Sequence, residues 1–299
     1  MRVNRLFVIG IDGVDVSIAE DQDMLLSDHV RWDLNDYPKN HTYRIWPSMY
    51  TGALPHRNPD LPDPLATKSN DAAANWRSGP LRAVSRAANS VVPQALRSWV
   101  GNLLLERGLA KVNPEADDWP DTVFDDHLSQ AINIPVYNPL PVQEDLKSGW
   151  IDRVRSGNAG LDALAELADE EMKVVNNTLN EALSRGYDLT WGYIYSPDIF
   201  GHLDYDHSYP RRAKLVWDEV VEPLRAKLGE DDELVVISDH GMRDVDGVGE
   251  HRPPGWFATT VDDGNLPQKP VAVRDWIDNL LGDRTQRREE TLRNLGYIE

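Results

Sequence analysis

The sequence ELVVISDHGM (Glu233–Met242) decides the fold, because an unbroken apolar run ends abruptly in an aspartate and a histidine. A short run rich in Val, Ile and Leu predicts a strand buried on both faces of a parallel sheet. Neighbouring residues within a strand point to opposite faces, so Asp239 and His240 share a site only where the strand ends and the chain turns. The stretch therefore predicts a buried strand whose carboxyl end carries a functional pair.

Two other apolar runs end in the same way. RLFVIGIDG ends at Asp12 and LTWGYIYSPD ends at Asp198. Helical patterns lie between the runs or follow them, at residues 161–185, 210–228 and 273–281, and Pro223 is expected to interrupt the second of these helices. This alternation predicts an α/β fold with a doubly wound, mostly parallel sheet and helices on both faces. Ligands of such folds bind beyond the carboxyl ends of the strands, where all three acidic ends are expected.

The length of 299 residues suits one large domain, and we predict a single catalytic domain over residues 1–299. Residues 57–160 are predicted to form an insertion or cap within it. Between Trp76 and Lys111 the chain has six basic residues and one acidic residue, against its general trend. The amphipathic segment 81–110 is open to three interpretations: a helical insertion packed on the domain, a lid over an anionic substrate, or a peripheral membrane surface.

The net charge is −19, with 8 Lys against 23 Arg. Such a surface is typical of a halophilic protein that stays soluble in very high salt, although an ordinary acidic protein is the alternative. It also argues against binding a nucleic-acid backbone. The start of the chain lacks a signal-peptide pattern and no 18-residue apolar run occurs, so a cytoplasmic location is expected. The oligomeric state is not predicted.

The chain has no cysteine, so any metal must be held by histidine and carboxylate ligands. SPDIFGH places Asp198 and His202 four residues apart, and His251 precedes another strand-like run in GEHRPPGWFATT. Each residue alone has an ordinary structural explanation, such as a turn aspartate or a hydrogen-bonded histidine. Together they fall at one predicted edge of the sheet, where two clusters of oxygen and nitrogen ligands suit zinc or manganese.

These motifs resemble the alkaline phosphatase superfamily, in its type I phosphodiesterase/nucleotide pyrophosphatase branch. The resemblance covers about residues 5–56 and 187–260. It consists of four motifs in the order of that branch, which are IGIDG at the first strand, the PDxxGH pattern at Pro197–His202, DHGM at Asp239–Met242, and a final histidine at His251.

The nucleophile that the resemblance implies is Thr42, nine residues before the Thr51–Gly52 pair in HTYRIWPSMYTG. Trp46 also falls where the family has a tryptophan. Two departures occur: Tyr43–Arg44 replaces a proline-containing pair, and the His-Gly that usually follows is reduced to His56. The competing hydroxyl is that of Ser48.

The resemblance implies two divalent metal ions, which we expect to be zinc, with manganese possible. One would take Asp12, Thr42, Asp239 and His240, and the other Asp198, His202 and His251. Thr42 would attack phosphorus, and the resulting phosphothreonine would be hydrolysed by water. Since Arg44 is the one basic residue within a matched motif, the expected substrate is a small-molecule phosphodiester or pyrophosphate rather than a monoester dianion.

Other functions remain open from the sequence. A sulfatase is excluded because no Cys or Ser lies in a C/S-x-P-x-R pattern, and 299 residues hardly allow the large inserted domain of independent phosphoglycerate mutase. Phosphonate-cleaving and phosphopentomutase-type enzymes stay possible. A phospho-headgroup transferase would use segment 81–110 as its membrane-facing part. A non-catalytic, metal-dependent binding module for phosphorylated glycans or lipids is the third alternative.

Overall fold

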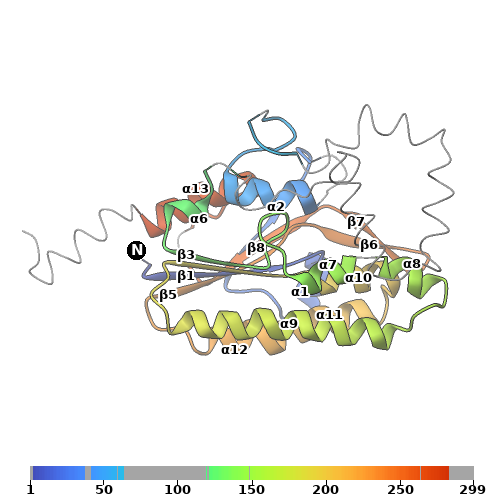
Figure 1. The fold of residues 1–299 in the computed structure, drawn as a ribbon. Coiled ribbons are helices and arrows are strands. Elements are labelled where there is room, and N and C mark those ends of the chain that lie inside the picture. The colour runs from blue at the N-terminus through green and yellow to red at the C-terminus, as the bar shows by residue number, and fades with distance from the viewer. Residues whose placement is uncertain are drawn as a thin grey trace, which may run out of the picture.

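A central six-stranded sheet forms the core of the computed structural model (Figure 1), which describes residues 3–37, 42–58, 60–63, 119, 121–147, 149–262 and 264–282. β1 (Arg5–Ile11) lies between β5 (Asp232–Ser238) and β4 (Leu189–Ile194) and runs parallel to both. The three apolar runs that end in acidic residues are therefore adjacent parallel strands, as predicted.

The outer strands complete the sheet in the order β2-β8-β5-β1-β4-β3. β3 (Ser129–Ile132) is parallel to β4, whereas β8 (Gly255–Thr259) is antiparallel to β5 and β2 (Asp28–Trp32) is antiparallel to β8. The prediction of a mostly parallel α/β sheet is confirmed. The strand-like run after His251 is β8, while β2 was not predicted.

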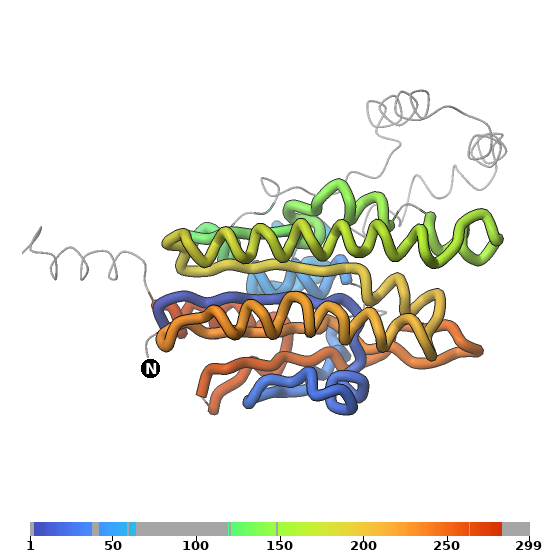
Figure 2. The backbone as a smooth tube through the Cα atoms, turned by 90° about the horizontal axis from the view of Figure 1, so that it is seen from below, coloured from blue at the N-terminus to red at the C-terminus, as the bar shows by residue number. Residues whose placement is uncertain are grey.

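Helices cover both faces of the sheet (Figure 1). α2 (Thr42–Thr51), α6 (Val123–Asp126) and α13 (Val273–Leu281) lie on one face. α9 (Leu161–Leu183) and α11 (Ser208–Val216) lie on the other, side by side in Figure 2.

The central strand supplies both cores, which explains why its apolar residues do not alternate with polar ones. Leu6 and Val8 pack into the cluster beneath α2 and α13, whereas Phe7, Ile9 and Ile11 pack into the cluster beneath α9 and α11. All five side chains are buried, as expected for a sheet that is covered on both sides.

The predicted interruption at Pro223 is a wide helical turn. The chain passes from α11 through a π-helical turn, η4 (Trp217–Val221), into α12 (Glu222–Arg225). Pro223 has no N–H to donate to the carbonyl of Glu219. The Asn176 side chain on α9 donates to that carbonyl instead, at 3.0 Å, so the interruption is also a contact between the two helices.

Four shorter helices gather near the carboxyl end of the sheet (Figure 1). They are α1 (Val16–Asp21), α7 (Pro141–Lys147), α8 (Trp150–Arg155) and α10 (Ser196–Leu203). A separate antiparallel hairpin of β6 (Gly241–Val245) and β7 (Val248–Arg252) stands at the same end, and a 3-10 turn, η5 (Pro270–Ala272), precedes α13.

The predicted insertion at residues 57–160 lies largely outside the described residues, and so does all of segment 81–110. Its described C-terminal part includes β3, which pairs with β4 in the main sheet. The division of the chain into a domain and an insertion stays a prediction. Within the described part of the chain, no helix combines the length and apolar character needed to cross a bilayer.

Candidate metal centre

The carboxyl ends of the three central strands bring the predicted acidic residues together. Asp12 directly follows β1, and Asp239 directly follows β5. After β4 the chain turns into α10, whose first turn carries Asp198 and whose last turn carries His202. All of these groups lie beyond one edge of the sheet, as the sequence predicted.

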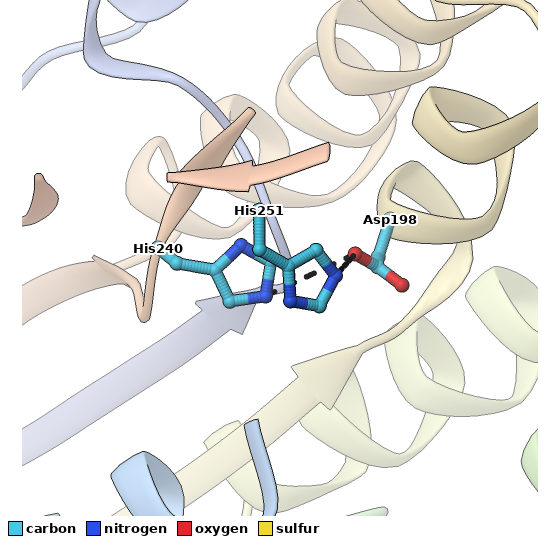
Figure 3. Close-up of side chains that lie close together, drawn as sticks. All are labelled: Asp198, His240 and His251. Atoms are coloured by element: carbon cyan, nitrogen blue, oxygen red, sulfur yellow. Dashed lines mark ion pairs between the residues drawn. The ribbon is translucent and has the colours of Figure 1, made fainter. Parts of the chain in front are cut away.

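His251 lies on a strand that the sequence did not predict. This strand is β7 of the hairpin, which extends beyond the carboxyl end of the sheet (Figure 1). Figure 3 shows its imidazole between His240 and Asp198. Its Nε2 lies 3.1 Å from Asp198 Oδ1, so residues 53 positions apart in the chain meet at one point.

The first group of candidate ligands consists of Asp12, Asp239 and His240, all completely buried. His240 Nε2 lies 3.3 Å from Asp12 Oδ1 and 3.6 Å from Asp239 Oδ2. Thr42 joins them, because its Oγ1 lies 3.2 Å from His240 Nε2 and 3.4 Å from Asp12 Oδ1.

The second group is built around Asp198 Oδ1. His202 Nε2 lies 3.5 Å from this oxygen and 2.9 Å from His251 Nε2. His240 belongs to this group as well, because its Nε2 is 3.9 Å from Asp198 Oδ1. The ligand atoms that lie close enough together to hold one ion are those of Asp198, His240 and His251, with His202 beside them. The structure thus brings all seven predicted residues together, with His240 at the junction between the groups.

Backbone carbonyls orient two of the imidazoles. His202 Nδ1 donates to the carbonyl of Gly249 at 2.8 Å, and His240 Nδ1 donates to the carbonyl of Gly241 at 3.1 Å. A proton held on Nδ1 leaves the lone pair on Nε2, which is the atom that each ring turns toward the carboxylates. Metal-ligating histidines are typically oriented in this way by a partner behind the ring.

Neutral hydrogen-bond donors hold two of the carboxylates. The Tyr193 hydroxyl donates to Asp12 Oδ2, and the backbone N–H of Gly13 donates to Asp239 Oδ1 at 3.3 Å. Asp239 Oδ2 is buried and accepts no hydrogen bond from the described residues. Since a buried carboxylate oxygen without a partner is costly, this atom fits a position that faces a cation.

The pKa shifts of the buried residues also indicate a site for cations. Burial, reinforced by the charge of Asp12, raises the pKa of Asp239 well above its usual value. Burial opposes ionisation of Asp198 too, but the imidazoles of His202 and His251 lower its pKa below the usual range. Burial acts against a charged His240, yet the Asp12 carboxylate raises the pKa of that imidazole. Divalent cations would relieve the mutual repulsion of these carboxylates, so the residues fit two metals.

Thr42 is the first residue of α2, and its side chain is 7% exposed. The backbone N–H groups of a helix's first turn favour negative charge next to them, which suits a nucleophilic oxygen and an incoming phosphate. A close approach sets the position of α2: a Cβ at Gly10 on β1 would lie 2.3 Å from the Trp46 ring, so only glycine lets this helix lie so near the strand.

The competing groups are engaged elsewhere. Ser48 Oγ is fully buried, lies 2.6 Å from the Tyr37 hydroxyl and donates to the carbonyl of Ile45. Arg44 makes a two-pronged ion pair with Asp63, at 3.1 and 2.7 Å. Neither side chain is shown in contact with the metal ligands.

Comparison with known protein families gives a match over residues 6–260 to the type I phosphodiesterase/nucleotide pyrophosphatase family. The chain belongs to this family. The resemblance seen in the sequence motifs is therefore confirmed, and the matched range includes every predicted site residue. Comparison with curated protein sequences gives no significant match.

Comparison with solved structures also gives matches, all at low sequence identity. Murine ectonucleotide pyrophosphatase/phosphodiesterase 5 is 16% identical with a TM-score of 0.39, and the similarity covers 80% of this chain and 57% of that one. Alkaline phosphatase from the Antarctic bacterium TAB5 is 8% identical with a TM-score of 0.43, covering 94% and 99% of the two chains. This family member thus spans little more than half the length of the murine protein.

Sequence analysis missed several residues that shape the site. Tyr193 lies within an apolar strand run, where an aromatic residue looks like ordinary core. Lys147 ends α7, and its ammonium lies 5.2 Å from the centre of the Tyr43 ring and 5.6 Å from that of Tyr195. Burial lowers the pKa of Lys147. No motif marks Lys147, whereas the period-two pattern of β4 places Tyr193 on the same face as Trp191.

We expect Tyr193→Phe to weaken the site without disturbing the core. The variant keeps the edge-on packing against Trp46, with ring centroids 4.9 Å apart, but loses the hydrogen bond to Asp12. Loss of such an outer partner typically costs about 10- to 100-fold in metal affinity or activity. Isothermal titration of metal-free protein with Zn²⁺ measures the effect. Tyr50→Phe is the matched control, since its buried hydroxyl has no partner among the described residues; equal affinities in the two variants would contradict the role.

A second outer contact ties the hairpin to the loop after β1. Arg252, which follows His251 in the chain, places its Nε and Nη2 each 2.9 Å from Asp15 Oδ2. We expect Arg252→Met to destabilise the fold at pH 7 by about 1–3 kcal/mol, because the fully buried Asp15 loses its cation. Burial opposes ionisation of Asp15, but Arg252 and Ser17 together lower its pKa below the usual value.

This pKa shift fixes the sign of the pH dependence. A lowered carboxyl pKa contributes stability above the unfolded-state value of about 4, and that stability is lost as the pH falls through the folded-state pKa. Urea unfolding at pH 7 and at pH 3 should therefore show a difference between wild type and Arg252→Met that shrinks in acid. Arg243→Met, on the exposed side of the same hairpin, is the control. A difference that grew in acid would contradict the assignment.

Proposed function

We propose that this protein is a metal-dependent hydrolase of phosphoric esters, which cleaves phosphodiester or pyrophosphate bonds through a phosphothreonine at Thr42. The observation that carries the proposal is the position of Thr42 Oγ1, which stands at a helix N-terminus within 3.4 Å of both Asp12 and His240. Membership of the type I phosphodiesterase/nucleotide pyrophosphatase family supports the same chemistry.

Two divalent ions, proposed to be zinc with manganese as the alternative, would be held by the two groups of ligands. Asp12, Thr42, Asp239 and His240 would hold one, and Asp198, His202 and His251 the other. Bound there, the two ions would lower the pKa of a coordinated hydroxyl or water and neutralise charge on the phosphoryl oxygens. The nitrogen and oxygen donors, without sulfur, suit either metal.

The chain's own groups define the two displacements. In the first displacement Thr42 Oγ1 gives its proton to Asp12 and bonds to phosphorus, while the P–O bond to the leaving group breaks and the leaving oxygen takes a proton from solvent. In the second, water attacks phosphorus opposite Thr42 and releases a proton to solvent. The bond to Thr42 then breaks, and Asp12 returns its proton to Oγ1. The backbone N–H groups at the start of α2 would stabilise the negative charge of a phosphoryl group bound next to Thr42.

The charges near Thr42 favour a diester or pyrophosphate over a monoester dianion. Arg44 is paired with Asp63. Lys147 lies against the Tyr43 ring, pairs with Glu144 at 3.3 Å and donates to the side chain of Gln143. A single lysine suits the one negative charge that a diester carries at each phosphorus. We expect Lys147→Met to raise KM for a diester by about tenfold, the equivalent of about 1.4 kcal/mol, with kcat little changed. Lys173→Met, on α9, is the control; an unchanged KM would remove Lys147 from the substrate side.

The decisive experiment compares p-nitrophenyl diester and monoester substrates. Metal-stripped protein is assayed with Zn²⁺ or Mn²⁺ added back, at low and at concentrated potassium chloride because of the acidic composition. Diester cleavage that appears with metal and disappears with chelator supports the proposal. Cleavage of the monoester alone would contradict the substrate class. Metal binding without cleavage of either ester would contradict hydrolysis and direct attention to a transferase or a binding module.

A further inference from the structure

A buried glutamate interrupts the apolar stripe of the longest helix. The buried positions of α9 are Leu164, Ala168, Glu171, Val175, Leu179 and Ala182. Glu171 is 0% exposed, although a carboxylate in such a stripe costs far more to bury than leucine. The role of this residue is not explained by the packing of α9 alone.

Three N–H donors converge on the Glu171 carboxylate. Oε1 accepts from the backbone N–H of Tyr195 at 2.9 Å and from Asn133 Nδ2 at 3.1 Å, and Oε2 accepts from the backbone N–H of Ser196 at 3.0 Å. A glutamine of the same size would turn an NH₂ donor toward one of these donors. Only a group that accepts through both oxygens satisfies all three.

The two backbone donors belong to the start of the metal-ligand helix. Ser196 is the first residue of α10 and Tyr195 precedes it, and Tyr195 supplies no side-chain cap of its own. Glu171 therefore caps α10 from another helix, two residues before Asp198 and one and a half turns before His202. Helix capping and negative charge at an N-terminus both stabilise this arrangement.

Asn133 extends the network into neighbouring backbone. Its side-chain Nδ2 also donates to the carbonyl of Tyr193 at 2.9 Å, and its Oδ1 accepts from the N–H of Leu140 at 2.8 Å. Burial raises the pKa of Glu171 to about 7, against the opposing effect of its N–H donors. The fold thus keeps the Glu171 carboxyl buried where β4 leads into α10, although its burial is energetically unfavourable.

We propose that Glu171 is a positioning residue that fixes the first turn of α10 and so aims Asp198 and His202 at the second metal. This inference rests on the proposed metal-dependent function. It assigns Glu171 no contact with metal or substrate. Its effect is exerted through the backbone of residues 195 and 196, and it should therefore act on one of the two metal groups.

Glu171→Gln tests the inference, with Glu170→Gln as the matched control because Glu170 is exposed on the same helix. Metal-free proteins are titrated with Co²⁺, followed by calorimetry and by the visible absorption of the bound ion. We expect Glu171→Gln to weaken one of the two binding steps by about 10- to 100-fold and to leave the other unchanged. Diester turnover should be recovered at high Co²⁺ with KM unaltered.

The possible results are distinguishable. Equal weakening of both binding steps, in parallel with a lower melting temperature, would overturn the positioning role in favour of a general structural one. Two unaltered binding steps in a folded variant would also overturn it. If Glu171→Gln does not fold, Glu171→Asp keeps both acceptor oxygens on a shorter side chain, and the same selective loss is expected. A wild-type protein that binds no Co²⁺ would instead refute the proposed function, and the inference with it.

Discussion

Replacing Thr42 with alanine is expected to lower kcat for a diester by roughly 10⁴-fold or more, the scale on which enzymes lose activity with their nucleophile. The structure places no second hydroxyl in the same position among the described side chains, because Ser48 is hydrogen-bonded to Tyr37 and to the carbonyl of Ile45. Stopped-flow or steady-state release of p-nitrophenolate measures the effect. Both metal-binding steps should persist in the variant, since the six Asp and His ligands are unchanged.

Two companion variants make this result specific. Thr42→Ser restores a hydroxyl at the same position and should recover most of the lost turnover. Ser48→Ala removes the competing hydroxyl and should leave turnover within a few-fold of wild type. Covalent labelling provides a direct check, because a phosphoryl group trapped in acid should map to residue 42. Near-normal turnover of Thr42→Ala, or a label on another residue, would refute the nucleophile assignment.

The fold was predictable because the sequences of the three central strands are typical of buried parallel strands. Each central strand is apolar on both faces, as a parallel sheet covered on both sides requires. An aspartate follows each strand within a few residues. The two antiparallel outer strands were harder. β8 has a short apolar run, but β2, with the sequence DHVRW, has only two apolar residues, which is too short an alternation to predict a strand. Its pairing depends on β8, a partner more than 200 residues away, and local pattern does not encode such a contact.

The candidate site was predictable to the extent that its residues follow strand ends. Asp12, Asp198 and Asp239 were placed by that rule alone. His251 was noted because it precedes the apolar run of β8. Its assignment to a particular metal came from the family resemblance, because it lies on a hairpin whose sequence, GMRDVDGVGEHR, has little apolar content. The role of Glu171 could not be predicted from the sequence. A glutamate is typical of a protein surface, yet the spacing of Glu171 puts it in the apolar stripe of α9. Only the backbone donors from a distant turn explain its burial.

Asp239→Asn is expected to have the second large effect, because it removes the carboxylate whose Oδ2 lacks a hydrogen-bond donor among the described residues. Loss of an outer partner of a metal ligand already costs about 10- to 100-fold in affinity, so loss of the ligand itself should exceed that range. Turnover of the diester should fall with the lost metal. Asp231→Asn, exposed at the opposite end of β5, is the control for changing one charge on the same segment.

The same substitution should have the opposite effect on the metal-free fold. Burial and the neighbouring Asp12 raise the pKa of Asp239, so its ionised form is disfavoured in the folded state. A raised carboxyl pKa means that stability is lost as the pH rises above the unfolded-state value of about 4. With chelator present, Asp239→Asn should therefore melt at a higher temperature than wild type, and by more at pH 8 than at pH 5. With Zn²⁺ the order should reverse, because wild type gains the binding energy of a metal that the variant holds poorly. A variant that melts lower than wild type under both conditions would show that Asp239 supports the fold rather than a metal.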